Sequence, residues 1–179
     1  MNTFIALLRG INVSGQKLIK MADLRTSLEK AGFAGAKTYI QSGNLILKSA
    51  ESDPEVIEEQ VKALILKDFG FDVPTFVTTA EYLEETVANN PYPDVEAKKL
   101  FVAYLNEAPA PERIEALNAQ DFSPEAYVID GKRIYLHAAL GAAKSKLSNN
   151  YFESKLKVKA TMRNWNTTNK LIALSRDAS

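Results

Sequence analysis

Two apolar runs stand out along the chain because neither of them has a polar face. Residues 3–9 and residues 100–105 are apolar at almost every position. Successive side chains of a β-strand point to opposite faces of the sheet, so a run of this kind is apolar on both faces. Such strands are typical of the centre of a sheet that is covered on both sides. We therefore predict two central strands, one in each half of the chain.

Helical spacing of apolar residues follows the first of these runs in two segments. Each segment ends at a glycine, and the second begins with an aspartate N-cap and a first-turn proline. The short strands on either side of Ser42-Gly43-Asn44 are expected to pair as a hairpin, because Gly and Asn tolerate a positive φ. In chain order, the predicted elements are a strand at residues 3–9, a helix at 21–31, strands at 37–41 and 45–48, a helix at 54–69 and a strand at 73–78.

The second half of the chain repeats this order after a short connecting helix, which Thr79 is predicted to cap. Asp130-Gly131 lies between two apolar runs, and this is a strong signal of a two-residue hairpin turn. Ser148 or Asn149 is expected to cap the last helix of the repeat. In chain order, the second half has a strand at residues 100–105, a helix that opens at Pro111, strands at 127–129 and 134–136, a helix that runs to Leu156 and a strand at 158–162.

The repeated order predicts an α+β protein made of two ferredoxin-like βαββαβ subdomains related by duplication. We expect the subdomains to pack as one compact unit, with a connecting helix and a C-terminal helix. The sheet faces that the subdomain helices leave open are expected to pack either on each other or on these two helices. The predicted divisions are residues 1–79 for the first subdomain, 80–98 for the connecting helix and loop, 99–162 for the second subdomain and 163–179 for the C-terminal helix.

Composition narrows the class of protein. Apolar residues make up 46% of the 179 residues, which is enough to build a core. The 22 basic and 22 acidic side chains balance, so no global field attracts nucleic acid or anionic lipid. Cysteine is absent, which excludes disulfides and thiolate chemistry. The N-terminal run is too short for a signal peptide or a membrane span, so we expect a cytoplasmic protein with no membrane partner.

Polar residues follow the first and second predicted strands. In a split βαβ unit these strands run parallel, so their carboxyl ends lie at one edge of the sheet. We therefore predict that two loops distant in sequence meet there. A structural role is equally open, with Gly43 and Asn44 making the turn and Arg9 and Asn12 bonding nearby carbonyls. The candidate ligand-binding residues at this edge are Arg9, Asn12, Lys17, Gln41, Ser42 and Asn44.

A second polar cluster surrounds Trp165, the only tryptophan of the chain. It lies directly before the apolar run at residues 171–174, so it is expected to precede or open the last helix. A helix start offers backbone N–H groups and a partial positive charge. The structural alternative makes Trp165 a core anchor and Asn164 or Asn166 the N-cap. The candidate ligand-binding residues here are Arg163, Asn164, Trp165, Asn166 and Lys170, and Lys146 of the segment Lys144-Ser145-Lys146 is a further candidate.

The candidate segments contain no carboxylates. A divalent-metal cage or a paired-acid site would need them, so we predict no metal and no cofactor. His137, the only histidine, is expected to end a strand in a structural or surface role. No Ser-His-Asp motif, P-loop or dinucleotide-binding glycine motif is present, and no catalytic residue is predicted.

Four segments together resemble a large, functionally uncharacterised bacterial family, known as a conserved domain of unknown function. They are LLRGINV at residues 7–13, QSGN at 41–44, SKL at 145–147 and TMRNWNT at 161–167. The resemblance covers essentially the whole chain and implies a two-subdomain ferredoxin-like α/β architecture. It implies no activity, substrate or partner.

Three functions are compatible with these observations. The first is binding of a small anionic ligand, phosphorylated or nucleotide-like, in which arginines and lysines hold the anion, amides read polar edges and Trp165 stacks. The second is binding of RNA or single-stranded nucleic acid, which the balanced charge and the lack of aromatic residues at 44–48 disfavour. The third is a protein-interaction module in which the motifs are structural.

Overall fold

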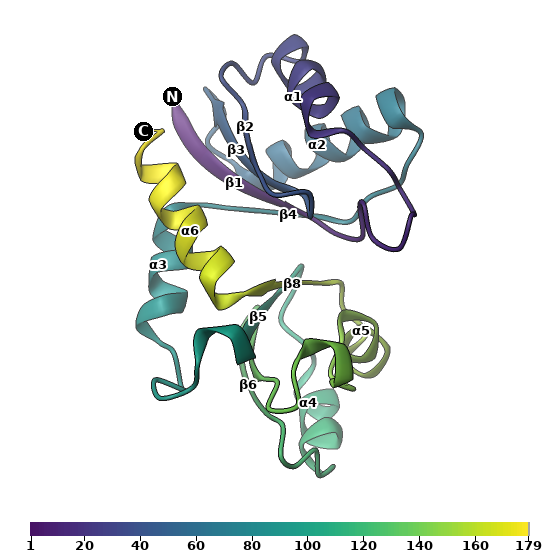
Figure 1. Ribbon diagram of the computed structural model, residues 1–179, viewed down its shortest axis with the longest axis vertical. Helices are drawn as coiled ribbons and strands as arrows, with labels where there is room; N and C mark the ends of the chain where they lie inside the picture. The colour runs from purple at the N-terminus through teal and green to yellow at the C-terminus, as the bar shows by residue number, and fades with distance from the viewer. Residues whose placement is uncertain (179) are drawn as a thin grey trace. The chain divides into compact units, whose positions relative to one another are not determined.

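The computed structural model describes residues 1–178, which form two compact units (Figure 1). The first unit comprises Met1–Thr86 and the residues from Lys170 onward, and the second comprises Val87–Asn169. The boundary falls inside two helices, α3 (Ala80–Ala88) and α6 (Trp165–Arg176). Each unit has one four-stranded sheet and its own hydrophobic core, so the predicted α+β class is confirmed.

The first unit has the strand order of a ferredoxin-like fold. Its sheet is ordered β2-β3-β1-β4, and every neighbouring pair of strands is antiparallel. β1 and β2 are therefore parallel to each other with β3 between them, as the sequence predicts. The elements are β1 (Asn2–Leu8), α1 (Met21–Lys30), β2 (Lys37–Tyr39), β3 (Asn44–Ser49), α2 (Pro54–Phe69) and β4 (Thr75–Thr78), followed by α3.

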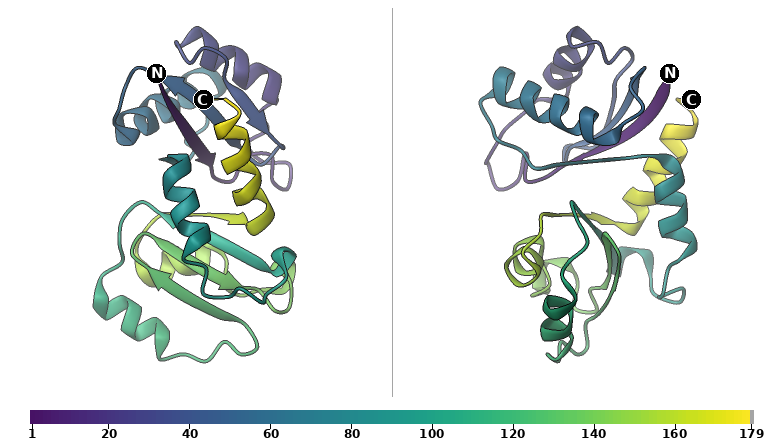
Figure 2. Two further views of the ribbon diagram at one scale, coloured as in Figure 1. Left: turned by 90° about the vertical axis from the view of Figure 1, so that its left-hand side faces the viewer. Right: turned by 180° about the vertical axis from the view of Figure 1, so that it is seen from behind.

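Helices cover both faces of this first sheet. α1 and α2 lie on one side of it (Figure 1), where Leu24 of α1 and Val61 of α2 join the same core as Phe4 of β1. The other face carries Ile5 and Leu7, which are fully buried as well. α3 and the part of α6 that belongs to this unit lie on that second side (Figure 2). The two-faced apolar pattern of β1 is thus explained by cover on both sides.

Local sequence fixes both ends of α2. Asp53 Oδ1 accepts a hydrogen bond from the Glu55 N–H at 2.9 Å, and Pro54 occupies the first helical position, where its missing N–H has no helical partner to lose. Gly70 adopts a left-handed φ of 75° and donates its N–H to the Leu66 carbonyl at 3.0 Å, which ends the helix. Both ends agree with the sequence prediction.

The second unit repeats the topology of the first. Its sheet is ordered β6-β7-β5-β8, again with antiparallel neighbours, so its four strands follow the same spatial order as those of the first unit. The elements are the 3₁₀ turn η1 (Ala97–Lys99), β5 (Leu100–Leu105), α4 (Pro111–Asn118), β6 (Ala126–Asp130), β7 (Arg133–His137), the 3₁₀ turn η2 (Ala142–Lys144), α5 (Asn149–Leu156) and β8 (Ala160–Asn164), followed by α6.

Aromatic rings build much of the core that α4 and α5 form with the second sheet. Phe122, Tyr127, Tyr151 and Phe152 stack edge to face, with ring centroids between 5.8 and 6.5 Å apart. Edge-to-face pairs add about 0.5–1.5 kcal/mol each beyond the burial of their area. This cluster therefore fixes the loop that carries Phe122 against the start of α5.

The first hairpin turns differently from the prediction. Positive φ values fall on Ile40 (51°) and Gly43 (85°), while Asn44 is the first residue of β3. Asn44 pairs with Tyr39 on one side and Leu7 on the other, so it belongs to the ladder and not to the turn. These two strand pairings determine the backbone conformation of Asn44 more strongly than the tolerance of asparagine for a positive φ does.

Two boundaries in the second unit also shift. Asp130 pairs with Arg133, so the hairpin turn consists of residues 131–132, one position later than predicted. β8 runs to Asn164, two residues beyond the predicted strand, because it pairs with β5 along its whole length. The last helix begins only at Trp165.

Candidate functional site

The loop after β1 is held closed by the side-chain amide of Asn12. Its Nδ2 donates to the carbonyls of Ile19 and Gln41, both at 2.9 Å, and its Oδ1 accepts from the Ile19 N–H at 2.8 Å. Asn12 has a positive φ of 54°, which asparagine adopts more readily than most residues. The amide joins this loop to the turn after β2, so the predicted meeting of the two loops is confirmed.

Replacing Asn12 by alanine removes all three hydrogen bonds and leaves a less tolerant residue at positive φ. We expect the free energy of unfolding to fall by about 1–3 kcal/mol, measured by urea unfolding followed by circular dichroism. Asn12→Gly, which restores the φ but not the bonds, should recover only part of this loss. Full recovery by glycine would show that the hydrogen bonds contribute nothing.

The turn after β2 uses its polar side chains internally. Asn44 is fully buried, and its Nδ2 donates to the Tyr39 carbonyl at 3.0 Å and to Ser42 Oγ at 3.1 Å. The Gly43 carbonyl accepts the Leu8 N–H at 2.7 Å, which ties the turn to the end of β1. The neighbouring Gln41 is exposed.

The cationic candidates of the first unit lie at the same edge. Lys17 Nζ donates to the Asp72 carbonyl at 2.5 Å, and the N–H of the half-buried Arg9 donates to the Pro74 carbonyl at 2.9 Å. Both bonds tie the β1 end of the sheet to the segment before β4. The six candidates of this unit are therefore clustered, but the amides of Asn12 and Asn44 hold the fold together.

The segment around Trp165 joins β8 to α6. Asn164 Oδ1 accepts from the Asn166 N–H at 2.9 Å, and Asn164 Nδ2 donates to the Ala97 carbonyl at 3.1 Å. Asn164 is thus the N-cap of α6, as the structural alternative proposed, and it also ties the helix start to η1. Trp165 is half-buried, and its carbonyl accepts from Asn169 Nδ2 at 2.9 Å.

Arg163 is a buried charge on the sheet of the second unit. It is 8% exposed, and its Nη1 donates to the Met162 carbonyl at 2.9 Å. Burial lowers the pKa of Arg163 to about 10, against an opposing influence of Tyr104, so the guanidinium stays charged at neutral pH. The alternation of the strands places Arg163 on the sheet face opposite α4 and α5.

The same face of this sheet holds further buried polar groups. Arg133 is 6% exposed and lies 3.0 Å from Asp130 through its Nε. The Tyr104 hydroxyl lies 3.1 Å from Thr168 Oγ1, and both residues are almost fully buried. Sequence analysis singled out Arg163 alone, although strand alternation was the signal that could have placed Tyr104 and Arg133 beside it.

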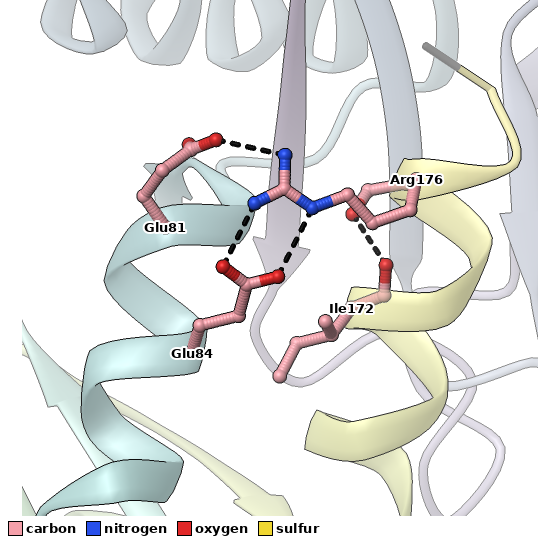
Figure 3. A network of polar contacts seen from close by, with 5 residues as sticks. Glu81, Glu84, Ile172 and Arg176 are labelled. Atoms are coloured by element: carbon pink, nitrogen blue, oxygen red, sulfur yellow. Dashed lines mark hydrogen bonds and ion pairs between the residues drawn. The ribbon is translucent and has the colours of Figure 1, made fainter.

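Arg176 forms a charge network at the end of α6, within the first unit (Figure 3). Its Nη2 and Nε lie 2.8 and 3.0 Å from the two carboxylate oxygens of Glu84, and its Nη1 lies 3.0 Å from Glu81 Oε1. Ser175 Oγ donates to the Ile172 carbonyl at 2.8 Å. The Glu84 carboxylate raises the pKa of Arg176. These charges satisfy one another and hold α6 beside α3, so we regard the network as structural.

A cavity of about 480 Å³ opens in the second unit between two loops. One wall is the loop from α4 to β6, and the other is the loop from β7 to α5. The first turn of α5 completes the lining. Cavities of this size accommodate small-molecule ligands. The lining residues that bear on its chemistry are Gln120, Asp121, Phe122, Glu125, Lys144, Lys146 and Tyr151.

The aromatic side of this cavity is fixed by packing. The rings of Phe122 and Tyr151 meet edge to face at 5.8 Å. The Tyr151 hydroxyl donates to Gln120 Oε1 at 3.1 Å, and Lys155 Nζ lies 5.6 Å from the centroid of the Tyr151 ring. Sequence analysis did not single out Phe122 or Tyr151, because no local motif distinguishes them from ordinary core aromatics.

The basic side of the cavity is a loop with an internally bonded backbone. The N–H groups of Lys144 and Ser145 both donate to the Gly141 carbonyl at 3.1 Å, and Ser145 Oγ accepts from the Leu147 N–H at 3.1 Å. The side chains of Lys144 and Lys146 are exposed and line the cavity. Within residues 1–178, neither lysine has an acidic partner.

The remaining candidates, Gln41, Asn166 and Lys170, occupy exposed positions and do not line this cavity. Over the described part of the chain, no three His, Cys, Asp or Glu side chains are grouped to hold a metal ion. No helix within the same residues is long and apolar enough to cross a bilayer.

Two units of one topology, with a ligand-sized cavity in the second, define a duplicated ferredoxin-like α+β protein. The chain belongs to the family described as Protein of unknown function (DUF1697), whose model matches residues 1–135. The match confirms the family resemblance. It includes Glu125 but ends before the loop from β7 to α5 that carries Lys144 and Lys146, here called the lysine loop.

A solved structure shares this fold. The conserved bacterial protein SP0830 from Streptococcus pneumoniae superposes with a TM-score of 0.75 at 21% sequence identity, over 97% of this chain and 98% of that chain. Comparison with curated proteins gives no match.

Proposed function

We propose that this protein binds a small molecule that carries an anionic group, in the cavity between the α4–β6 loop and the β7–α5 loop. The observation that carries the proposal is the pair of lysines, Lys144 and Lys146. Both line a cavity of ligand size, and neither is neutralised by an acidic side chain of residues 1–178. Lysine ammonium groups bind phosphate and carboxylate oxygens by charge-assisted hydrogen bonds.

The lysine loop supports this proposal better than the arginine motifs do. Arg163 is buried and donates to its neighbour's carbonyl, and Arg9 is half-buried. Lys144 and Lys146, in contrast, are exposed on a loop that the hydrogen bonds to Gly141 hold in place. A loop whose backbone is already ordered loses little conformational entropy when a ligand binds.

Removing both loop charges should weaken binding. We expect Lys144→Met together with Lys146→Met to reduce the affinity for a phosphorylated probe by about a hundredfold or more, because two charge-assisted hydrogen bonds are lost and each is worth about 1.5–3 kcal/mol. The measurement is a thermal-shift screen of phosphorylated small molecules, followed by calorimetric titration of the strongest one. Inorganic phosphate, phosphoserine and glucosamine 6-phosphate are suitable first probes.

The matched control is Lys132→Met together with Lys159→Met, which removes the same charge from exposed positions of the same unit outside the cavity. This control should bind the probe as the wild type does. If both double variants lost the same affinity for the probe, the loss would be due to the change in net charge. The proposal that the probe binds in the cavity would then be rejected. A gel shift with mixed RNA that only the Lys144 and Lys146 variant loses would instead favour nucleic-acid binding at this loop.

A further inference from the structure

The carboxylate of Glu125 is an anomaly in the same cavity. Glu125 lies directly before β6, is 8% exposed and lines the cavity together with Lys144 and Lys146. Its Oε2 is fully buried and meets no hydrogen-bond donor from residues 1–178. Buried carboxylates normally have such a donor, because removing a charge from water without a partner is costly.

Other partly buried carboxylates of the chain follow the normal rule. Glu58 Oε2 accepts from the Val77 N–H at 3.3 Å, and Glu153 Oε1 accepts from the Ala160 N–H at 2.9 Å. Each of these carboxylates bonds a backbone group within its own unit. Glu125 Oε2 therefore differs from these oxygens in having no donor from residues 1–178, although its residue lines the cavity.

The second acid of the cavity is already engaged. Asp121 is exposed, and its Oδ1 accepts from the Ser123 N–H at 2.9 Å and from the Ser123 hydroxyl at 2.7 Å. These two bonds lower the pKa of Asp121 and assign its carboxylate to the local turn. Glu125 thus differs from Asp121, because it is the buried acid of the cavity and no donor from residues 1–178 reaches its Oε2.

We infer that the ligand of this cavity is a small zwitterion, whose ammonium group binds the Glu125 carboxylate while its anionic group binds Lys144 and Lys146. This inference rests on the proposed function, since it identifies the class of ligand at the same site. Two acids and two lysines line the cavity, so its formal charge is zero and it matches a ligand whose own charges nearly cancel. Aminoalkyl phosphates, amino sugar phosphates and amino acids have this chemistry.

Pairs of probes that differ by one amine test the inference. Phosphoethanolamine is compared with ethyl phosphate, and glucosamine 6-phosphate with glucose 6-phosphate, by calorimetric titration of the full chain. We expect the wild type to bind the amine of at least one pair about tenfold or more tightly than its partner, the ratio for one charged hydrogen bond. Glu125→Gln should bring that ratio close to one while leaving the amine-free probe unaffected.

Asp121→Asn is the matched control, because it removes an equal charge from the rim but keeps the Oδ1 acceptor of the Ser123 turn. This variant should keep the amine preference of the wild type. The apo melting temperature supplies a readout that does not need a ligand. Glu125→Gln should leave that temperature unchanged or raise it, because an amide costs less to bury without a partner than a carboxylate does.

The outcomes separate the two claims. If no probe binds the wild type, the proposed function fails and this inference fails with it. If both members of each pair bind equally, the anion site stands and the zwitterion inference is overturned. A marked fall in the apo melting temperature of Glu125→Gln would also overturn the inference, because it would give the carboxylate a structural partner.

Discussion

Replacing Gly43 by alanine is expected to lower the free energy of unfolding by about 3 kcal/mol or more. Gly43 has a φ of 85°, which disfavours any residue with a Cβ. A Cβ at this position would lie 2.6 Å from the Leu8 Cβ and 2.9 Å from Ile11 Cδ1. Leu8 belongs to the central strand β1, and its Cβ is attached directly to the backbone, so it has no rotamer that relieves the contact.

Gly35→Ala is the matched control for this variant. Gly35 has a similar φ of 68°, but a Cβ there would meet no atom within 4 Å. We expect this control to lose only the cost of the left-handed conformation, about 1 kcal/mol. Thermal and urea unfolding of both variants would measure the difference. If the two variants were equally stable, the close contact with β1 would have no energetic consequence.

The second large effect is expected for Arg163→Ala, which should lower the free energy of unfolding by about 3–5 kcal/mol. Arg163 is 8% exposed, so truncation leaves a void on the buried face of the second sheet and strands groups that its guanidinium satisfies. Burial lowers the pKa of Arg163 to about 10. Below that pH, the cost of burying the charge lowers the free energy of unfolding. As the pH rises above about 10 the group loses its proton, this cost disappears and the free energy of unfolding increases.

Asn166→Ala provides the comparison for Arg163, because it alters the same motif at an exposed position on α6. Its melting temperature should stay within a few degrees of the wild type, since surface changes typically cost less than about 0.5 kcal/mol. Selective loss of probe binding by Arg163→Ala, with an unchanged melting temperature, would contradict the structural role and return this motif to the ligand site.

The strand order was predictable because both central strands are apolar on two faces. β1 and β5 are covered on each side, and only a central strand needs that pattern. The caps of α2 were predictable for a different reason, since Asp53 and Gly70 act through bonds to residues two to four positions away. Hydrogen bonds between residues so close in the chain can be predicted from the sequence.

The turn at Ile40 was not predictable in the same way. A β-branched residue at positive φ is disfavoured locally, and it is tolerated here because strand pairing on both sides of Asn44 sets the register of β3. Pairing across strands is a non-local interaction. The propensity of a single residue therefore gave the wrong position for the turn.

The candidate site was predicted in part. The two loops at the end of β1 do meet, because topology alone brings them together, as the bond from Asn12 to Gln41 shows. The amides proved to be engaged within the fold, and sequence cannot show that an amide is already bonded. Glu125 was missed because its distinctive property is burial without a donor, which depends on where two loops lie in space.

The division of the chain has a consequence for its synthesis on the ribosome. The first unit needs the residues from Lys170 onward, among them the buried Leu171 and Ser175, yet all of Val87–Asn169 is translated before them. The sheet face that carries Ile5 and Leu7 is therefore not covered by α6 until the end of synthesis. The second unit is one continuous stretch of the chain, so it can fold as it emerges from the ribosome. A nascent chain stalled near residue 165 would expose an apolar surface that the finished protein hides, and chaperones bind surfaces of that kind.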